Sequence, residues 1–260
     1  MTSARTKDGR QRGGGVFLTG EWRYLAMLNY RIDPALLEPH VPAGTTLDAW
    51  QGAAYVSIVG FLFRRTRVLG VPIPWHQDFE EVNLRFYVRR EVDGEIRRAV
   101  TFISEIVPRR AIAALARLAY NEPYRALPMR HSLEQCTDAE RAPGRVEFAW
   151  RLPAGWSSLV VETSGLAQPL AAGSEAEFIT EHYWGYTRQR DGGTVEYRVT
   201  HPRWRTWTVD RATLAGDVSE LYGPEFSEVL AAPPDSAFLA EGSPIAVHLP
   251  RRLAAASCPP

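Results

Sequence analysis

The chain has 260 residues, of which 45% are hydrophobic and 23% are charged, ordinary values for a globular protein. Its 30 basic and 30 acidic side chains cancel, so no global field would attract nucleic acid or an anionic membrane. The two cysteines, Cys136 and Cys258, lie far apart, which indicates no disulfide framework and suits a reducing cytosol. The longest apolar run, residues 55–63, is too short to span a bilayer. We therefore expect a cytoplasmic protein that binds neither nucleic acid nor membranes.

Lysine is almost absent from this chain. Only Lys7 is a lysine, and it lies in a basic leader, residues 1–15, that we expect to be disordered. A Schiff base needs a primary amine with a lowered pKa, and arginine cannot replace it because its guanidinium stays protonated. General replacement of lysine by arginine is the simplest origin of this bias. Whatever the origin, the sequence excludes catalysis through an amine in the folded part of the chain.

The first predicted strand covers residues 22–30. The period of two that β-structure imposes places Arg23 on the same side as Leu25 and Met27. An arginine among apolar neighbours is either an edge residue or a residue directed into a lined cavity. A helix is then predicted from Asp33, an N-cap followed by proline, through residues 35–40.

A strand is expected over residues 54–64, and the next, over residues 79–89, is strictly amphipathic. One face carries apolar residues and the other carries polar ones: Val82, Leu84, Phe86 and Val88 against Glu81, Asn83, Arg85 and Tyr87. If the sheet closes into a barrel, the polar face lines its lumen. On a sheet with one face in water, Glu81 would instead be a plain solvent-facing glutamate.

The rest of the chain alternates short β-type segments with few helices. A helix over residues 109–120 has an apolar stripe formed by Ile112, Leu115, Ala116 and Ala119. Another helix begins with a capping box, Ser174 with Glu177, and is predicted to continue through Tyr183. A short helix is possible at 226–230, and the remaining predicted strands are residues 99–107, 145–152, 194–199, 204–210 and 245–249. Many strands with few helices favour a barrel or a sandwich.

Three segments in this order resemble the acetoacetate decarboxylase superfamily. The first combines Arg23-Tyr24-Leu25 with Tyr30-Arg31-Ile32-Asp33-Pro34 and Val41-Pro42; the second is Phe79-Glu80-Glu81; the third is residues 117–125, RLAYNEPYR. Over most of its length, roughly residues 16–250, the chain is more similar to a bacterial branch of that superfamily, the YqjF-like proteins. The segments that carry this second resemblance are residues 78–90, 102–129, 181–186 and 199–204.

The resemblance implies a mainly β fold, with a cone-shaped closed antiparallel barrel wrapped by a second antiparallel sheet. Residues 16–255 would form one domain. In the decarboxylases a Lys-Lys pair stands where this chain has Tyr124 and Arg125, so the resemblance does not carry over the Schiff-base chemistry. The second active-site carboxylate of that family has no clear counterpart here, and Ser57 is the nearest candidate.

The candidate site residues follow from the resemblance and from residue chemistry. Glu81 is the candidate general acid or base and Tyr124 the candidate proton donor, with a pocket-lining aromatic as the favoured alternative for Tyr124. Arg23 would clamp a carboxylate through its bidentate guanidinium. Asn83, Arg117 and Arg125 complete the predicted substrate-binding set, with a simple helix-surface position as the alternative for Arg117.

Metal and nucleic-acid sites have weaker support. The six histidines show no metal-ligand spacing, and His182 is better explained as part of a pocket wall or core. No Gly-rich phosphate loop follows a strand, so we expect neither metal nor cofactor. The Arg- and Trp-rich run at residues 201–207 is typical of base stacking, but a neutral chain favours cross-strand packing of these side chains.

Two functions remain open at this stage. The first is a protein without Schiff-base chemistry that binds a small carboxylate or keto compound and performs acid–base chemistry on it, as a hydratase, isomerase or lyase does. The second is a non-catalytic small-molecule-binding protein on the same barrel, and a purely structural module is a weaker third. A homo-oligomer, at least a dimer, is also expected.

Overall fold

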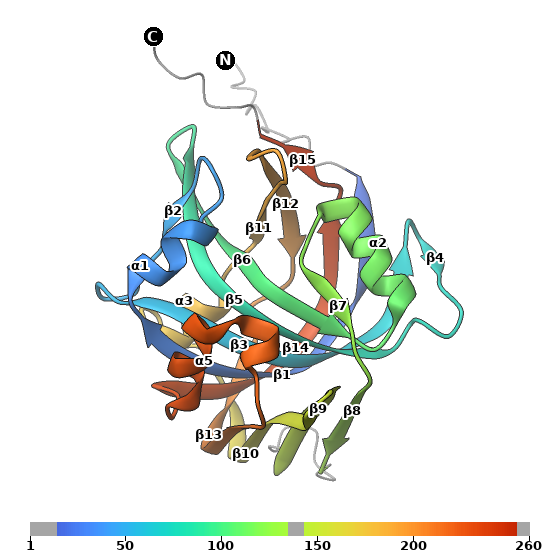
Figure 1. The fold of residues 1–260 in the computed structure, drawn as a ribbon, viewed down its shortest axis with the longest axis vertical. Helices are drawn as coiled ribbons and strands as arrows, with labels where there is room; N and C mark the ends of the chain where they lie inside the picture. The colour runs from blue at the N-terminus through green and yellow to red at the C-terminus, as the bar shows by residue number, and fades with distance from the viewer. Residues whose placement is uncertain (1–14, 135–142, 254–260) are drawn as a thin grey trace, which may run out of the picture.

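The computed structural model describes residues 15–134 and 143–253. The predicted leader (except Gly15), both cysteines and the last seven residues lie outside this part of the chain. Within it the fold is mainly β, as the sequence predicted, and Figure 1 shows strands curling around a common axis with helices on the outside.

The centre of the fold is a closed ring of hydrogen-bonded strands. In ring order these strands are β1 (Val16–Ile32), β3 (Ala54–Val68), β5 (Phe79–Val92), β6 (Glu95–Val107), β11 (Trp184–Arg188), β12 (Thr194–Thr200) and β14 (Ser236–His248). Neighbours run antiparallel except β6 and β11. The shorter strands β2 (Thr46–Leu47), β4 (Val71–Pro72), β7 (Tyr124–Ala126) and β15 (Arg251–Arg252) pair along the edges of the ring. The predicted barrel is therefore present.

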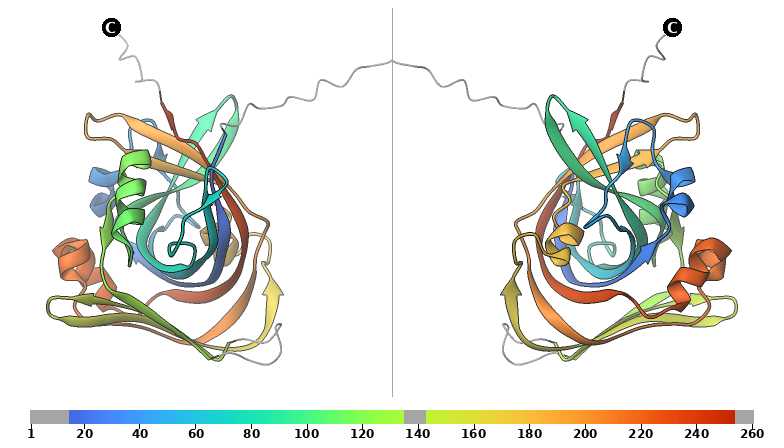
Figure 2. Two further views of the ribbon diagram at one scale, coloured as in Figure 1. Left: turned by 90° about the vertical axis from the view of Figure 1, so that its right-hand side faces the viewer. Right: turned by 90° about the vertical axis from the view of Figure 1, so that its left-hand side faces the viewer.

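A second sheet continues from β14 and curves beneath the ring, as Figure 2 shows. It consists of β13 (Arg205–Ala215), β10 (Gly155–Pro169), β9 (Arg145–Leu152) and β8 (Met129–Leu133). The apolar face of β5 packs into the core between the two layers together with Phe148 and Trp150. At Gly60 the layers approach closely, since a Cβ there would lie 2.7 Å from the Phe148 ring. The alternation predicted for β5 is thus confirmed: its other face belongs to the interior of the ring.

The helices are short; the predicted ones are present, and one further helix, residues 219–222, was not predicted. They are α1 (Pro34–Leu37) with the 3-10 turn η1 (Glu38–His40), α2 (Arg110–Tyr120), α3 (Glu175–Thr180), α4 (Ser219–Tyr222) and α5 (Pro224–Ala231). Asp33 caps α1 and Ser174 caps α3 through their side chains. The prediction that the third helix reaches Tyr183 was wrong, because Glu181 leaves the helical conformation and the chain enters β11 at Trp184.

A β-bulge in β1 corrects the predicted orientation of Arg23. Tyr24 has a positive φ of 55°, and the register against β3 shifts between Arg23 and Ala26. Because the bulge inserts one residue, Trp22 and Leu25 both line the interior. Arg23 consequently does not share the side of Leu25.

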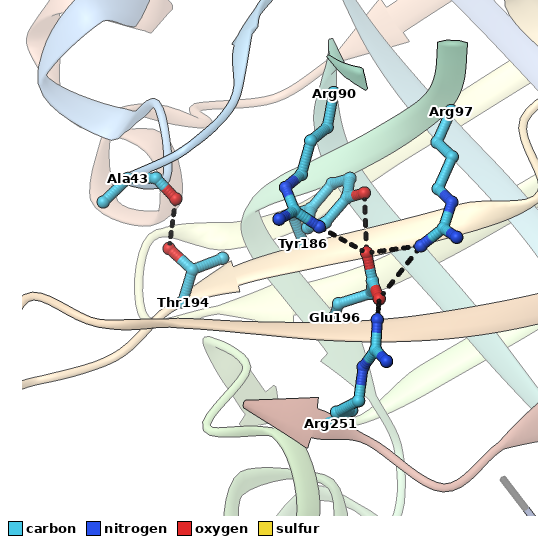
Figure 3. A network of polar contacts seen from close by, with 7 residues as sticks. All are labelled: Ala43, Arg90, Arg97, Tyr186, Thr194, Glu196 and Arg251. Carbon is cyan, nitrogen blue, oxygen red and sulfur yellow. Dashed lines mark hydrogen bonds and ion pairs between the residues drawn. The ribbon is translucent and has the colours of Figure 1, made fainter. Parts of the chain in front are cut away.

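A buried carboxylate, that of Glu196, connects several strands of the ring (Figure 3). Glu196 of β12 is 2% exposed and accepts hydrogen bonds from Arg90, Arg97, Arg251 and the Tyr186 hydroxyl. These contacts join β5, β6, β11 and β15 to β12, close to the short parallel pairing of β6 with β11. The network therefore reinforces the ring beside one of its two shortest backbone pairings.

Candidate functional site

The interior of the ring holds a cavity of about 120 Å³. Aromatic side chains form much of its wall, among them Trp22, Phe61, Phe79, Phe102, Tyr120, Trp184 and Trp204. Helix α2 closes one side through Ile112, Leu115 and Ala116, which belong to the apolar stripe predicted for this helix. Most of the ionisable groups that face the cavity come from β5, β6 and the segment after α2.

Three buried carboxyl groups, Glu81, Glu105 and Glu122, face the cavity near the Tyr124 hydroxyl. Tyr124 donates a hydrogen bond of 3.0 Å to Oε2 of Glu81, and the Asn83 amide donates one of 3.1 Å to Oε1. Glu105 lies opposite Asn83 in the β5–β6 pairing. Its Oε2 atom has no hydrogen-bond partner among the described residues. This oxygen is therefore available to a ligand.

Glu122 lies where the chain turns from α2 into β7. Asn121 ends the helix with a left-handed φ of 57°, and the Tyr124 backbone N–H then donates to the Glu122 carbonyl oxygen at 2.8 Å. The Tyr197 hydroxyl donates a short hydrogen bond to Oε1 of Glu122. The Tyr197 ring lies directly over Gly185, where a Cβ would come within 2.1 Å of it. A larger residue at Gly185 would push Tyr197 away from Glu122.

Burial dominates the electrostatics of this cluster. It raises the pKa of Glu81 to about 7, with hydrogen bonds from Asn83 and Tyr124 acting in the opposite direction. Burial raises the pKa of Glu122 to about 8 and that of Glu105 well above its ordinary value, where repulsion from Glu122 and Glu81 adds to it. Because three carboxylates cannot all ionise in one dry space, the cluster keeps protons at neutral pH and contains both an acid and a potential base.

This arrangement predicts an unusual dependence of stability on pH. Glu122 ionises freely near pH 4.5 when unfolded but holds its proton to about pH 8 when folded, so the free energy of unfolding should fall between these values. Glu122→Gln removes the ionisation and should stabilise the protein at pH 8 by on the order of 3 kcal/mol, after allowing for a weakened Tyr197 hydrogen bond. Denaturant titrations at pH 5 and pH 8 measure the difference. The exposed Glu91→Gln is the control, and an unchanged pH dependence in Glu122→Gln would contradict the buried ionisation.

Arg85 and His182 form a second polar region of the cavity, at the end closed by α3. Arg85 donates to the Ile179 carbonyl oxygen at 3.3 Å, and its buried Nε has no partner among the described residues. His182 contacts the same carbonyl oxygen through Nδ1, so Nδ1 carries the proton and Nε2 is an acceptor. Burial and the nearby guanidinium groups of Arg98 and Arg85 lower the pKa of His182. In the part of the chain that the structure describes, no carboxylate lies within ion-pair distance of Arg85, so this guanidinium is left for an anion.

The structure brings only some of the predicted site residues together. Glu81, Asn83 and Tyr124 line the cavity. The three predicted arginines do not appear among its described lining residues: Arg23 pairs with Glu21 at 2.7 Å, Arg117 donates to the Ala113 carbonyl oxygen, and Arg125 pairs with Glu220 at 3.5 Å. Ser57 is buried and is not among the described lining residues; it forms hydrogen bonds of 2.6 Å with Asn29 and Tyr87. These positions correct the expectation that Arg23 reaches the lumen.

The sequence reasoning missed Glu105 and Glu122 as site residues. A bulge in β6, where the register against β5 shifts between Leu84 and Arg85, puts Glu105 on the same side as Phe102, against the period of two. The available signal was the position of Glu105 itself, the one charged residue in the predicted strand 99–107. For Glu122 it was the Tyr120–Glu122–Tyr124 alternation.

Over residues 15–134 and 143–253, no group of three or more His, Cys, Asp or Glu side chains is placed to hold a metal ion. None of the helices described is long and apolar enough to cross a membrane.

The fold is similar to solved structures of acetoacetate decarboxylase-like proteins. The enduracididine biosynthesis enzyme MppR in complex with pyruvate superimposes with a TM-score of 0.64 at 14% identity, covering 97% of this chain and 95% of that one. Acetoacetate decarboxylase from Legionella pneumophila gives 0.62 at 14% identity, with 98% and 92% covered. An acetoacetate decarboxylase-like enzyme from Sphingomonas wittichii RW1 gives 0.61 at 15% identity, with 98% and 99% covered. At these identities the likeness establishes the fold.

The sequence itself identifies the family. A search of curated proteins finds no match to this chain. A family model named DUF2071 and described as "Uncharacterized conserved protein" matches residues 19–244, which include every cavity-lining carboxyl group described above. This match agrees with the predicted place of the chain in the YqjF-like branch of the acetoacetate decarboxylase-like superfamily. The chain therefore belongs to the DUF2071 family, on an acetoacetate decarboxylase-like fold.

Proposed function

We propose that this protein is an enzyme that binds a small oxo acid in the ring cavity and moves a proton at the carbon next to the carbonyl group. The observation that carries the proposal is a pair of buried carboxyl groups beside Tyr124 in the cavity: the Tyr124 hydroxyl donates to Glu81, and Glu105 lies opposite Tyr124 in the β6–β7 pairing. Proton transfer of this kind is the common step of isomerases, hydratases and many lyases. It requires no primary amine, in agreement with the single lysine, Lys7.

The two carboxyl groups take different roles because their environments differ. Glu81 has the lower pKa of the two, about 7, since Asn83 and Tyr124 both donate hydrogen bonds to its oxygens. It is ionised in part of the molecules at neutral pH and acts as the base. Glu105 retains its proton and donates a hydrogen bond from its open oxygen to the substrate carbonyl. Pairs of acids whose pKa values are driven apart have such divided roles.

The proton step balances within these groups. Glu81 removes a proton from the α-carbon, the C–H electron pair moves into the C–C bond, and the carbonyl oxygen becomes an enolate oxygen. The Glu105 proton stabilises that oxygen through a hydrogen bond. Return of the proton to the same carbon restores the substrate. If that carbon also carries a hydroxyl group, the enediolate can take the proton at the former carbonyl carbon instead, the hydroxyl loses its proton to become the new carbonyl, and an isomer results. Tyr124, hydrogen-bonded to Glu81, orients the base.

Arg85 supplies the counter-charge for the acid part of the substrate. Its Nε has no partner among the described residues, and it lines the same cavity two strand positions beyond Asn83. With Glu105 and Glu122 protonated, a carboxylate at Arg85 meets little repulsion. MppR, similar to this chain in fold alone, was solved with pyruvate, a 2-oxo acid, which supports this substrate class without establishing it for this chain.

The test is proton exchange in heavy water. Wild-type protein incubated with 2-oxobutanoate is expected to replace the C3 protons by deuterium faster than buffer does, and NMR follows the loss of signal. A thermal shift with the same acid, absent with 2-butanone, would show that the carboxylate is recognised. A thermal shift without exchange would favour the non-catalytic binding protein, and absence of both would overturn the proposal.

A further inference from the structure

The polarity of the cavity is segregated along its length. The carboxyl groups of Glu81, Glu105 and Glu122 are buried, with residue exposures of 3%, 1% and 6%. The lining residues that are half-buried on the α2 side of the cavity are instead apolar: Phe17, Leu18, Val68, Ile112, Leu115 and Ala116. These residues form the apolar side of the cavity, between β1, the end of β3 and α2.

This apolar side, which we take as the entrance for a ligand, is a fixed part of the fold. Leu18 lies opposite Val68 in the β1–β3 pairing, and the Leu69 backbone N–H donates to the Phe17 carbonyl oxygen at 2.8 Å. Helix α2 faces them with Ile112 and Leu115. Backbone hydrogen bonding thus sets the position of one wall, and a helix anchored by the buried Ala113 sets the other.

A row of aromatic rings joins the entrance to the acids. The Phe17 ring contacts Tyr120 edge-on at 5.4 Å between centroids, and Tyr120 contacts Tyr197 at 4.8 Å. The Tyr197 hydroxyl ends the row at Glu122. The Tyr120 hydroxyl is held by the His248 carbonyl oxygen at 3.1 Å, so Phe17 and Tyr120 offer flat apolar ring surface to a hydrocarbon chain and Tyr197 alone carries its hydroxyl to the acids.

We propose that the substrate is an amphiphilic oxo acid, with its carboxylate and carbonyl at the buried end and an unbranched or aryl tail of several carbons along Phe17, Leu18, Val68 and Leu115. This inference rests on the proposed function for the head group and adds the tail. A cavity of about 120 Å³ is of the size that holds a benzene-sized group, so a longer tail extends from it between β1 and α2.

A homologous series of 2-oxo acids tests the tail. 2-Oxobutanoate, 2-oxohexanoate and 2-oxooctanoate differ only in methylene groups, and their dissociation constants are measured by calorimetry and by quenching of tryptophan fluorescence. Burial of each methylene should tighten binding about fourfold. Equal dissociation constants across the series would overturn the inference.

Variants locate the tail. Leu115→Gln should reduce the gain per methylene, so that its effect on the dissociation constant grows from 2-oxobutanoate to 2-oxooctanoate. Leu118→Gln on the same helix is the matched control, because Leu118 is 87% exposed and should leave the whole series unchanged. Val68→Thr, of similar volume and on the opposite wall, repeats the test should Leu115→Gln fail to fold. A length dependence that persists unchanged in both entrance variants would overturn the placement of the tail.

Failure of the proposed head-group chemistry and failure of the proposed tail site give different results. Exchange with 2-oxobutanoate but no length dependence would overturn the tail and leave the proposed function intact. Length dependence without proton exchange on any acid would support the tail and overturn the acid–base function.

Discussion

Replacing Glu81 by glutamine is expected to slow α-proton exchange about 10²- to 10⁴-fold, the usual contribution of a positioned general base. The amide has nearly the shape of the acid and still accepts the hydrogen bond from Tyr124 or Asn83, at present 3.0 and 3.1 Å long. It cannot take up a proton from carbon. The loss should therefore fall on the exchange rate rather than on the affinity for the oxo acid.

The dependence of the exchange rate on pH tests the role of Glu81 a second time. Because the pKa of Glu81 is raised to about 7, the wild-type exchange rate should rise with pH up to about that value as the base ionises. It should fall again at higher pH as Glu105 loses the proton that binds the carbonyl oxygen. The residual rate of Glu81→Gln should lack the rising limb.

Glu80 offers a matched control on the same strand. Its side chain points away from the cavity and pairs with His131 at 2.6 Å, so Glu80→Gln changes the same chemical group one residue away. Its exchange rate should equal that of wild type. Equal rates in Glu81→Gln and Glu80→Gln would show that Glu81 is not the base.

How far the sequence predicts the fold depends on the regularity of each strand. In β5 the alternation is unbroken from Phe79 to Val88, so the polar face with Glu81 and Asn83 was predicted from periodicity alone. The capped helix starts at Asp33 and Ser174 were predicted correctly for the same reason: each signal acts within a few residues. Closure of the ring was implied only by the family resemblance, since the pairing of β12 with β14 depends on residues distant in sequence.

The site was predicted less well because bulges decide which side chains enter it. One extra residue in β1 turns Arg23 outward, and one in β6 turns Glu105 inward. A bulge has no reliable sequence signature, and a shift by one residue exchanges the two faces of a strand. Arg85 lies in β5, whose alternation is regular. The sequence placed Arg85 on the correct face but did not identify it as a main site residue. At Arg23 the bulge overrides the local alternation, so the sequence pattern assigns this arginine to the wrong face. At Arg85 the alternation alone places the guanidinium on the interior face.

These positions lead to opposite expectations for two arginines. Arg85→Gln should weaken binding of 2-oxobutanoate at least about 30-fold, since truncating one partner of a desolvated charge pair costs 2–5 kcal/mol or more. Affinity for the uncharged 2-butanone should not fall. Arg23→Gln should leave both affinities unchanged, because the side chain of Arg23 is 36% exposed and already paired with Glu21.

The comparison separates two explanations of anion recognition in this ring. If the Arg85 guanidinium binds the carboxylate, Arg85→Gln loses affinity for acids only. The pKa of Glu81 should also rise in this variant, since the Arg85 guanidinium helps to lower it in the wild-type protein. The rising limb of the exchange profile should then move to higher pH in Arg85→Gln. A large loss in Arg23→Gln with none in Arg85→Gln would place the carboxylate outside the cavity described here and would contradict the proposed orientation of the substrate.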